Sequence, residues 1–283
     1  MSATAEQPYK VCEEITRNHA ANFFYGIRLL PAEKRRAMCA AYALARRIDD
    51  VGDGEMPDAD KLRALTALRE QVSALPDAPT GDPVLSAVGD ATRRFALPVD
   101  AFVDLVDGVH MDVAGTTYDQ FDELVSYCRR VAGTIGRLCL AIFDSRQQPE
   151  AVALADDLGV AMQLTNILRD VREDLERGRV YLPAEDLRRF GCSPGLDGSP
   201  PGALAELIRF EAARAGEWFD RGLGLLPLLD ARSASCVATM TGIYRRILER
   251  IERDPSAVLR ERVSLPAWEK GWVAMRSLAG AVG

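Results

Sequence analysis

Apolar residues recur at helical spacing through most of the chain, and no stretch alternates between apolar and polar residues for long enough to predict a strand. In the clearest case, residues 31–50, a proline and an acidic residue open a run rich in alanine, leucine and arginine, which favour helix. The same pattern predicts further helices over residues 59–75, 83–95, 98–111, 119–143, 150–177, 203–229 and 232–253. The sequence therefore predicts an all-α protein.

A long loop is predicted over residues 191–202, which contain three prolines and four glycines. We expect this loop to be an excursion within one domain, because candidate site residues lie on both sides of it. The predicted domain spans residues 1–283, with flexible ends at residues 1–15 and 275–283. The chain has no repeat of fixed period, which argues against a non-enzymatic scaffold of stacked helix pairs.

One stripe of polar residues lies on the alanine-rich helix and consists of Tyr42, Arg46, Asp49 and Asp53. These residues are three or four positions apart and so share one helix face. The two aspartates would repel each other in an isolated helix. A divalent cation bound between them would make the electrostatic interaction favourable. Mg²⁺ suits such a pair, because it prefers one or two carboxylates together with water and phosphate oxygens. The alternative is a solvated acidic helix end.

A second stripe consists of Gln163, Asn166, Asp170 and Asp174. Its spacing of i, i+3, i+7 and i+11 again defines a single helix face. Amide and carboxylate oxygens suit a hard cation, although a wet face with salt bridges to neighbouring arginines would have the same pattern. Two such stripes with arginines nearby together indicate a cluster that grips a diphosphate through metal ions and guanidinium groups.

Two glycines, Gly133 and Gly136, interrupt the helical pattern of residues 119–143, where glycine costs about 1 kcal/mol relative to alanine. Close approach of a neighbouring helix explains them, and a groove for a long apolar substrate is a compatible functional reason. Tyr127 lies one to two turns before these glycines and could face the same groove.

The composition argues against several other classes of protein. A net charge of −7 and a pI of about 5.1 do not suit a nucleic-acid binder. The six cysteines lack metal-ligand spacing and only two histidines are present, so we expect free thiols in a reducing compartment and no zinc site. An apolar signal core and a run of ~20 apolar residues are both absent, which predicts a cytoplasmic protein with at most peripheral membrane contact.

Three tryptophans are expected to be packing residues: Trp218, Trp268 and Trp272.

The sequence resembles the squalene/phytoene synthase family of head-to-head prenyl transferases from about His19 to Arg262. Within that family, the chain looks most like the bacterial presqualene diphosphate synthases. The resemblance rests on four segments: F-F-Y-G-I-R-L-L-P, Y-A-L-A-R-R-I-D-D-V-G-D, Y-C-R-R-V-A-G-T-I-G and Q-L-T-N-I-L-R-D-V-R-E-D-L-E-R-G-R-V-Y-L-P.

This resemblance implies a single isoprenoid-synthase-type helical domain around a deep central cavity, with Mg²⁺ at its polar end and Mn²⁺ as a substitute. The implied metal ligands are Asp49, Asp53, Asn166, Asp170 and Asp174. The implied catalytic residues are the four aspartates of this set with Tyr42 and Tyr127. The implied substrate-binding residues are His19, Asn22, Phe23, Arg46, Gln163, Asn166, Arg169, Arg179, Tyr181, Tyr244 and Arg262. One departure concerns Ala20 and Asn22, where family members often carry serines that help to bind a diphosphate; only Asn22 can donate a side-chain hydrogen bond.

The expected reaction joins two farnesyl diphosphates head to head into presqualene diphosphate, a precursor of squalene and hopanoids. The first alternative is phytoene synthase, which uses two geranylgeranyl diphosphates, and dehydrosqualene or squalene synthase is the second. The sequence has no glycine-rich dinucleotide loop, so NADPH is not indicated. The expected partners are prenyl diphosphates and downstream isoprenoid enzymes, with no nucleic acid.

Overall fold

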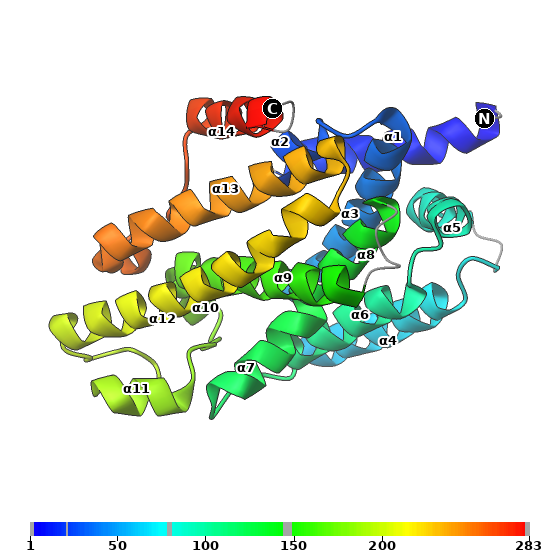
Figure 1. Cartoon of the computed structure of the whole chain (residues 1–283). Coiled ribbons are helices and arrows are strands. Elements are labelled where there is room, and N and C mark those ends of the chain that lie inside the picture. The colour runs from blue at the N-terminus through cyan, green and yellow to red at the C-terminus, as the bar shows by residue number, and fades with distance from the viewer. Residues whose placement is uncertain (1–2, 21, 78–80, 144–148, 281–283) are drawn as a thin grey trace.

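The computed structural model describes residues 3–20, 22–77, 81–143 and 149–280, and all regular structure in these ranges is helical (Figure 1). The prediction of an all-α protein is confirmed. The first helices are α1 (Ala3–His19), α2 (Phe23–Ile27), α3 (Ala32–Asp53), α4 (Asp58–Ser73), α5 (Pro83–Phe95), α6 (Val99–Val113) and α7 (Phe121–Cys128). The π-helical turn η1 (Arg129–Gly133), α8 (Thr134–Phe143), α9 (Pro149–Arg169), α10 (Val171–Glu176), α11 (Ala184–Phe190) and α12 (Pro201–Gly222) follow. The chain then forms η2 (Leu223–Leu228), α13 (Ala231–Arg253), η3 (Pro255–Leu259) and α14 (Ala267–Gly280).

Two of the predicted helices differ from the observed ones in ways that shape the site. The helix predicted over residues 31–50 continues through Gly52 to Asp53. The pattern over residues 150–177 is broken at Asp170, which occupies the N-cap position of α10 and separates it from α9. The helices α1, α2, α11 and α14 were not predicted.

The helix α9 crosses the middle of the molecule and organises the core around it (Figure 1). It packs against α12, η1, α8 and α13, and α12 and α13 also lie against each other. By length and composition α9 could cross a membrane, yet more than half of its most apolar window is buried inside the protein. A central core helix accounts for this composition. The deep cavity implied by the resemblance stays a prediction.

Glycine allows α9 to touch the backbone of its neighbours. A Cβ added to Gly159 would lie 2.7 Å from the Ala132 carbonyl oxygen and 2.7 Å from the Gly133 nitrogen. A Cβ on Gly136 would similarly meet the Ala155 carbonyl oxygen at 2.7 Å. The sequence-based expectation that Gly133 and Gly136 mark a close helix approach is therefore confirmed. The contact falls on η1, where the α-helical hydrogen-bond pattern is interrupted.

The two ends of the described chain are more ordered than the sequence led us to expect. The segment expected to be flexible before residue 16 belongs largely to α1, and its Tyr9 and Cys12 are buried. At the other end α14 continues to Gly280. Two of the tryptophans expected in packing, Trp268 and Trp272, are instead exposed on α14, so that expectation was wrong for them.

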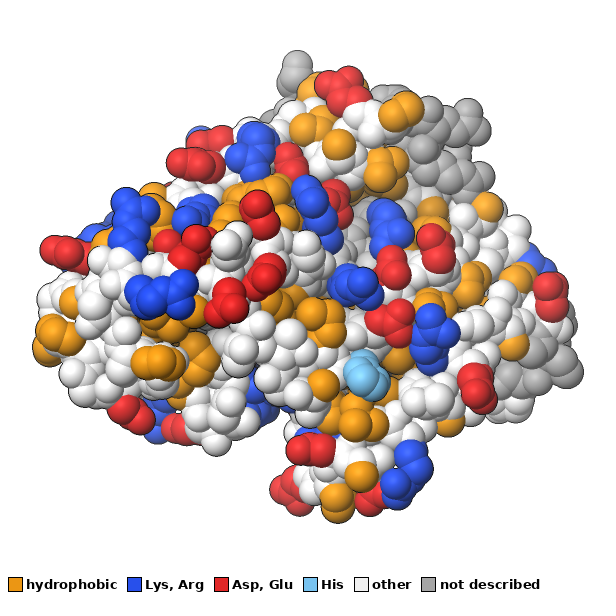
Figure 2. Space-filling model, turned by 90° about the horizontal axis from the view of Figure 1, so that it is seen from below, with side chains coloured by type: hydrophobic (Ala, Val, Ile, Leu, Met, Phe, Trp, Pro, Cys, Tyr) orange, Lys and Arg blue, Asp and Glu red, His pale blue; other side chains and the backbone are white. Residues whose placement is uncertain are grey.

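The surface mixes charges of both signs. On the face shown in Figure 2, lysine and arginine side chains alternate with aspartate and glutamate, and neither sign gathers into a broad patch. This face therefore carries charges of both signs side by side.

The Gly159→Ala substitution should destabilise the protein by about 2 kcal/mol or more, because backbone atoms of η1 cannot move aside as a flexible side chain can. Chemical denaturation followed by far-UV circular dichroism measures this loss. The matched control is Gly216→Ala in α12, where an added Cβ meets nothing within 4 Å and helix propensity should increase stability slightly. Equal stability of Gly159→Ala and the parent protein would contradict the close approach.

Candidate active site

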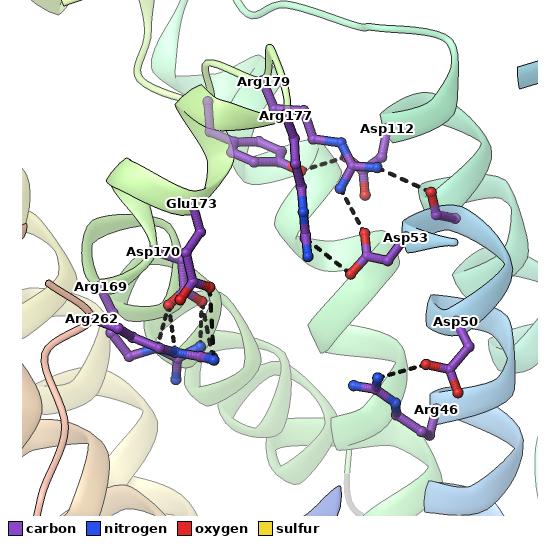
Figure 3. A network of polar contacts seen from close by, with 12 residues as sticks. Arg46, Asp50, Asp53, Asp112, Arg169, Asp170, Glu173, Arg177, Arg179 and Arg262 are labelled. Carbon is purple, nitrogen blue, oxygen red and sulfur yellow. Dashed lines mark hydrogen bonds and ion pairs between the residues drawn. The ribbon is translucent and has the colours of Figure 1, made fainter. Parts of the chain in front are cut away.

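The C-terminal end of α3 and the junction between α9 and α10 face each other and carry the two predicted stripes (Figure 3). Close packing of α3 on α6 brings further groups to the same place. A Cβ on Gly52 would overlap the side chain of Val109 in α6, so only glycine permits this approach. The last residue of α3, Asp53, thereby becomes an electrostatic neighbour of Asp112 in α6.

Asp53 joins the two motifs through ion pairs. Arg179 donates to Asp53 Oδ1 at 2.9 Å, and Arg177 donates to Asp53 Oδ2 at 3.2 Å (Figure 3). Arg179 also donates to the carbonyl oxygen of Gly52 at 3.3 Å. Both arginines follow α10, 124 and 126 residues beyond their partner. The structure thus brings Arg179 to the first aspartate pair, as a shared site requires.

Asp170 is held by arginines in the same way. Arg169 donates to both of its carboxylate oxygens, with Nε at 2.8 Å from Oδ1, and the Arg262 Nε lies 2.9 Å from the same Oδ1 (Figure 3). Arg262 comes from the segment before α14 and also lies 3.8 Å from Glu173. In the first stripe, Arg46 forms an ion pair of 2.6 Å with Asp50. Asp50 follows Asp49 in the sequence, and Asp49 is the aspartate that was expected to bind metal.

Several carboxyl groups of this cluster hold their protons unusually tightly. Burial, then the charge of Asp53, raises the pKa of Asp49 to about 7. The side chain of Asp49 nevertheless keeps some exposure to solvent. Burial, then the charge of Asp170, raises the pKa of Asp174 to about 7. Burial, and after it the neighbouring carboxylates, disfavour the ionised forms of both groups, and a bound cation would relieve both effects.

The residues can hold a hard cation, although no group of three or more histidine, cysteine or acidic side chains is arranged as a metal site within the described ranges. Asn166 donates its amide N–H to Gln163 at 3.2 Å, while its buried Oδ1 has no hydrogen-bond partner. An unpaired buried oxygen is costly, and a cation would satisfy it. Asp53 and Asp170 are each turned toward arginines, which explains why the carboxylates are not gathered around one point.

A cluster of tyrosines surrounds Asp112. This aspartate was not predicted from the sequence as a site residue. Tyr127 and Tyr181 each donate a hydroxyl hydrogen bond of 2.9 Å to this carboxylate. Their rings lie 5.4 Å apart, and the buried Tyr118 lies 5.5 Å from Tyr127 with no hydrogen-bond partner for its hydroxyl. Burial raises the pKa of Asp112 to about 6, against the lowering effect of both tyrosine bonds. A lone aspartate at a helix end has no spacing signal by which the sequence could have revealed it.

A second aromatic group contains three residues predicted to contact substrate. The Phe23 ring lies 6.4 Å from Tyr42 and 5.6 Å from Tyr244. Burial raises the pKa of Tyr42 to about 12, so its hydroxyl is a hydrogen-bond donor and a poor base. Asn22 precedes α2 without capping it through its side chain, which leaves its amide available. His19 is exposed at the end of α1 and, within the described chain, no hydrogen bond or ion pair joins it to the other site residues.

The loop that follows α11 also reaches this region. Leu196 is buried and lines a recess of about 10 Å³ together with Asp174, Arg179 and Tyr181. The expectation that residues 191–202 are an excursion within one domain stays a prediction.

Comparisons with known proteins extend over nearly the whole chain. A family model described as squalene/phytoene synthase matches residues 16–269. The phytoene synthase of Mycobacterium tuberculosis is 50% identical over 285 residues, which cover 98% of this chain and 92% of the relative. The 15-cis-phytoene synthase of a Synechocystis species is 36% identical over 284 residues, which cover 95% of this chain and 83% of the relative.

Solved structures of similar proteins have the same helical fold. A dehydrosqualene synthase in complex with a ligand has a TM-score of 0.89 at 26% identity and covers 98% of this chain and 97% of its own. A squalene synthase from Alicyclobacillus acidocaldarius has a TM-score of 0.83 at 29% identity, over 90% of this chain and 97% of its own. The expected isoprenoid-synthase-type helical fold is confirmed.

Mg²⁺ should raise the midpoint of thermal unfolding more at about pH 8 than at about pH 6, because protons compete with the metal for carboxylates whose pKa lies near 7. The raised pKa values of Asp49 and Asp174 mean that the metal-free protein loses stability as the pH rises from about 4 to 7, and bound Mg²⁺ restores it. Scanning fluorimetry with and without Mg²⁺ measures the difference. Equal shifts at both pH values, or shifts retained after Asp49→Asn and Asp174→Asn are combined, would contradict the metal assignment. The exposed Asp220→Asn serves as the control.

Proposed function

The chain belongs to the squalene/phytoene synthase family, whose members are prenyltransferases, and we propose that it is a phytoene synthase that joins two geranylgeranyl diphosphates head to head. The observation that carries the proposal is 50% identity over 98% of the chain to relatives named phytoene synthase. The dehydrosqualene and squalene synthases with known structures are only 26% and 29% identical. The comparisons thus favour the first alternative from the sequence over formation of presqualene diphosphate.

Magnesium ions are the proposed cofactor, with Mn²⁺ as a substitute. Asp49 and Asp53 would hold them on one side of the site, and Asn166, Asp170 and Asp174 on the other. Support comes from the unpaired Asn166 oxygen and from the raised pKa values of Asp49 and Asp174. Bound magnesium would supply positive charge to the leaving diphosphate.

The arginines are proposed to exchange partners when substrate binds. In the structure Arg177 and Arg179 neutralise Asp53, and Arg169 and Arg262 neutralise Asp170. Once these carboxylates face cations, the guanidinium groups can donate to diphosphate oxygens. Such charge-assisted bonds stabilise the negative charge that grows as the allylic C–O bond breaks.

The aromatic residues are proposed to shape the path of the carbocation. Phe23, Tyr42 and Tyr244 offer ring faces, which attract a cation and exclude water. The alkene of the second substrate attacks this cation, a carbon–carbon bond forms, and loss of a proton closes the cyclopropane. Loss of the remaining diphosphate, rearrangement of the resulting cation and loss of a second proton would then give phytoene. Neither Tyr42 nor Tyr127 is suited to take that proton, because burial raises the pKa of both. An oxygen of the released diphosphate is the better acceptor.

A cytoplasmic location is proposed, because the six cysteines are all free and buried, as expected in a reducing compartment. Downstream isoprenoid enzymes are the proposed protein partners. NADPH is not part of the proposal.

The substrate assignment is tested by incubating the full chain with Mg²⁺ and either geranylgeranyl or farnesyl diphosphate, with the products identified by mass spectrometry. Phytoene from geranylgeranyl diphosphate is expected as the main product. Faster use of farnesyl diphosphate would overturn the assignment in favour of the presqualene or dehydrosqualene alternatives. Absence of turnover with either substrate would remove the proposed activity altogether.

Asp49→Asn and Asp170→Asn should each lower turnover by about 100-fold or more, since each removes a carboxylate from one wall of the proposed diphosphate site. Initial rates at saturating Mg²⁺ measure the effect, with far-UV circular dichroism to confirm folding. The control is Asp220→Asn, an exposed aspartate of α12 paired with Arg245, which should retain the parental rate. Near-parental rates in both site variants would refute the assignment of the two walls.

A further inference from the structure

The C-terminal helix α14 presents apolar side chains to solvent along one face. Trp268 is 73% exposed, Trp272 40% and Met275 66%. Their spacing of i, i+4 and i+7 places them in one stripe, which we call the Trp stripe. Only Met56 and Leu259 are comparable exposed large apolar residues in the rest of the described chain. Tryptophan buries a large area at low entropic cost, so exposing two of them together is expensive unless something covers them.

The opposite face of α14 anchors the helix to the body of the protein. Glu269 is buried and paired with Arg246 at 2.7 Å and with Arg250 at 2.5 Å, both from α13. Val273 and Ala274 are buried beside it. Figure 1 shows α14 at the outer edge of the molecule, and its contacts are with α13 and α2. The Trp stripe is therefore held outward on a fixed helix.

The charges around the Trp stripe are positive. Two guanidinium groups lie near the Trp272 ring: the Arg246 Cζ is 4.8 Å and the Arg276 Cζ 5.4 Å from its centroid, and Arg246 is also paired with Glu269. The only carboxylate of α14, Glu269, is turned inward and neutralised. Arg276 is exposed beside the stripe. In a chain of net charge −7, a tryptophan-rich face bordered by cations is a local exception.

We propose that the Trp stripe docks onto a lipid bilayer that carries anionic headgroups. Tryptophan prefers the boundary between headgroups and acyl chains, where its ring is buried and its N–H stays hydrated. Arginine at the same level pairs with lipid phosphates. The exposed apolar area and the flanking positive charge together match this surface, as in helices that lie in the interface plane.

Docking there would bring the candidate site close to the bilayer. Lys270, on the same helix, is near enough to Arg169 and Arg262 for their charges to lower its pKa, after burial as the main cause. One residue of α14 is thus an electrostatic neighbour of the arginines of the second wall, and the outer face of the helix would rest on lipid.

The experiment is flotation of the full chain with vesicles of phosphatidylcholine alone or mixed with phosphatidylglycerol, combined with tryptophan quenching by brominated phosphatidylcholine. Trp218 is the one other tryptophan of the chain and lies on α12, stacked with Arg221 at 4.0 Å. We expect flotation with the anionic vesicles and quenching that persists in Trp218→Phe. Trp268→Ser combined with Trp272→Ser should weaken binding by about tenfold or more and abolish quenching.

Arg276→Glu provides a second variant and should weaken binding to the anionic vesicles while leaving the helical circular dichroism unchanged. The proposal is overturned if the parent protein floats with neither vesicle, or if the double tryptophan variant floats equally well. A change from dimer to monomer in the double variant, measured by sedimentation without lipid, would instead identify the stripe as an interface between copies. Flotation, quenching and sedimentation do not depend on enzymatic turnover. Their results would therefore stand even if the protein did not have the proposed phytoene synthase activity.

Discussion

The structure depends on the balance of charge where the two aspartate stripes meet. Asp53, at the end of α3, is held by Arg177 and Arg179, which follow α10. This contact ties the first helical motif to the second, and Gly52 makes room for it by letting α3 lie directly on α6. Without the arginines, the carboxylates that α3, α6 and α10 bring to this place would repel one another.

The same balance explains the chemistry proposed for the site. Asp170 is neutralised by Arg169 and Arg262, whereas Asp49 and Asp174 hold protons up to about pH 7. Arginines therefore neutralise two of the carboxylates, Asp53 and Asp170, that are proposed to bind metal. Binding of a metal diphosphate would supply cations to the carboxylates and an anion to the arginines at the same time. Binding of the metal should therefore strengthen binding of the diphosphate, and the reverse.

Much of this arrangement could be predicted from the sequence, because it depends on local periodicity. The spacing of Asp49 to Asp53 places the first pair on one face of α3, and the glycines of residues 133–136 mark the close approach of α9. The spacing also picks out the residues of the second stripe, but it does not reveal that the helix breaks at Asp170, between α9 and α10. Asp112 could not be found in this way. Its role arises from hydroxyl groups of Tyr127 and Tyr181, which come from other parts of the chain. The exposure of Trp268 was missed for a similar reason, since tryptophan in sequence suggests packing and only the fold shows which face of α14 is covered.

Carboxylates and arginines are proposed to exchange partners when a metal diphosphate binds. Calorimetric titration with inorganic diphosphate, with and without Mg²⁺ and in buffers of different ionisation enthalpy, measures this exchange. We expect that Mg²⁺ strengthens diphosphate binding by at least about tenfold and that protons are released near pH 7. Equal affinity without Mg²⁺, with no proton released, would contradict it.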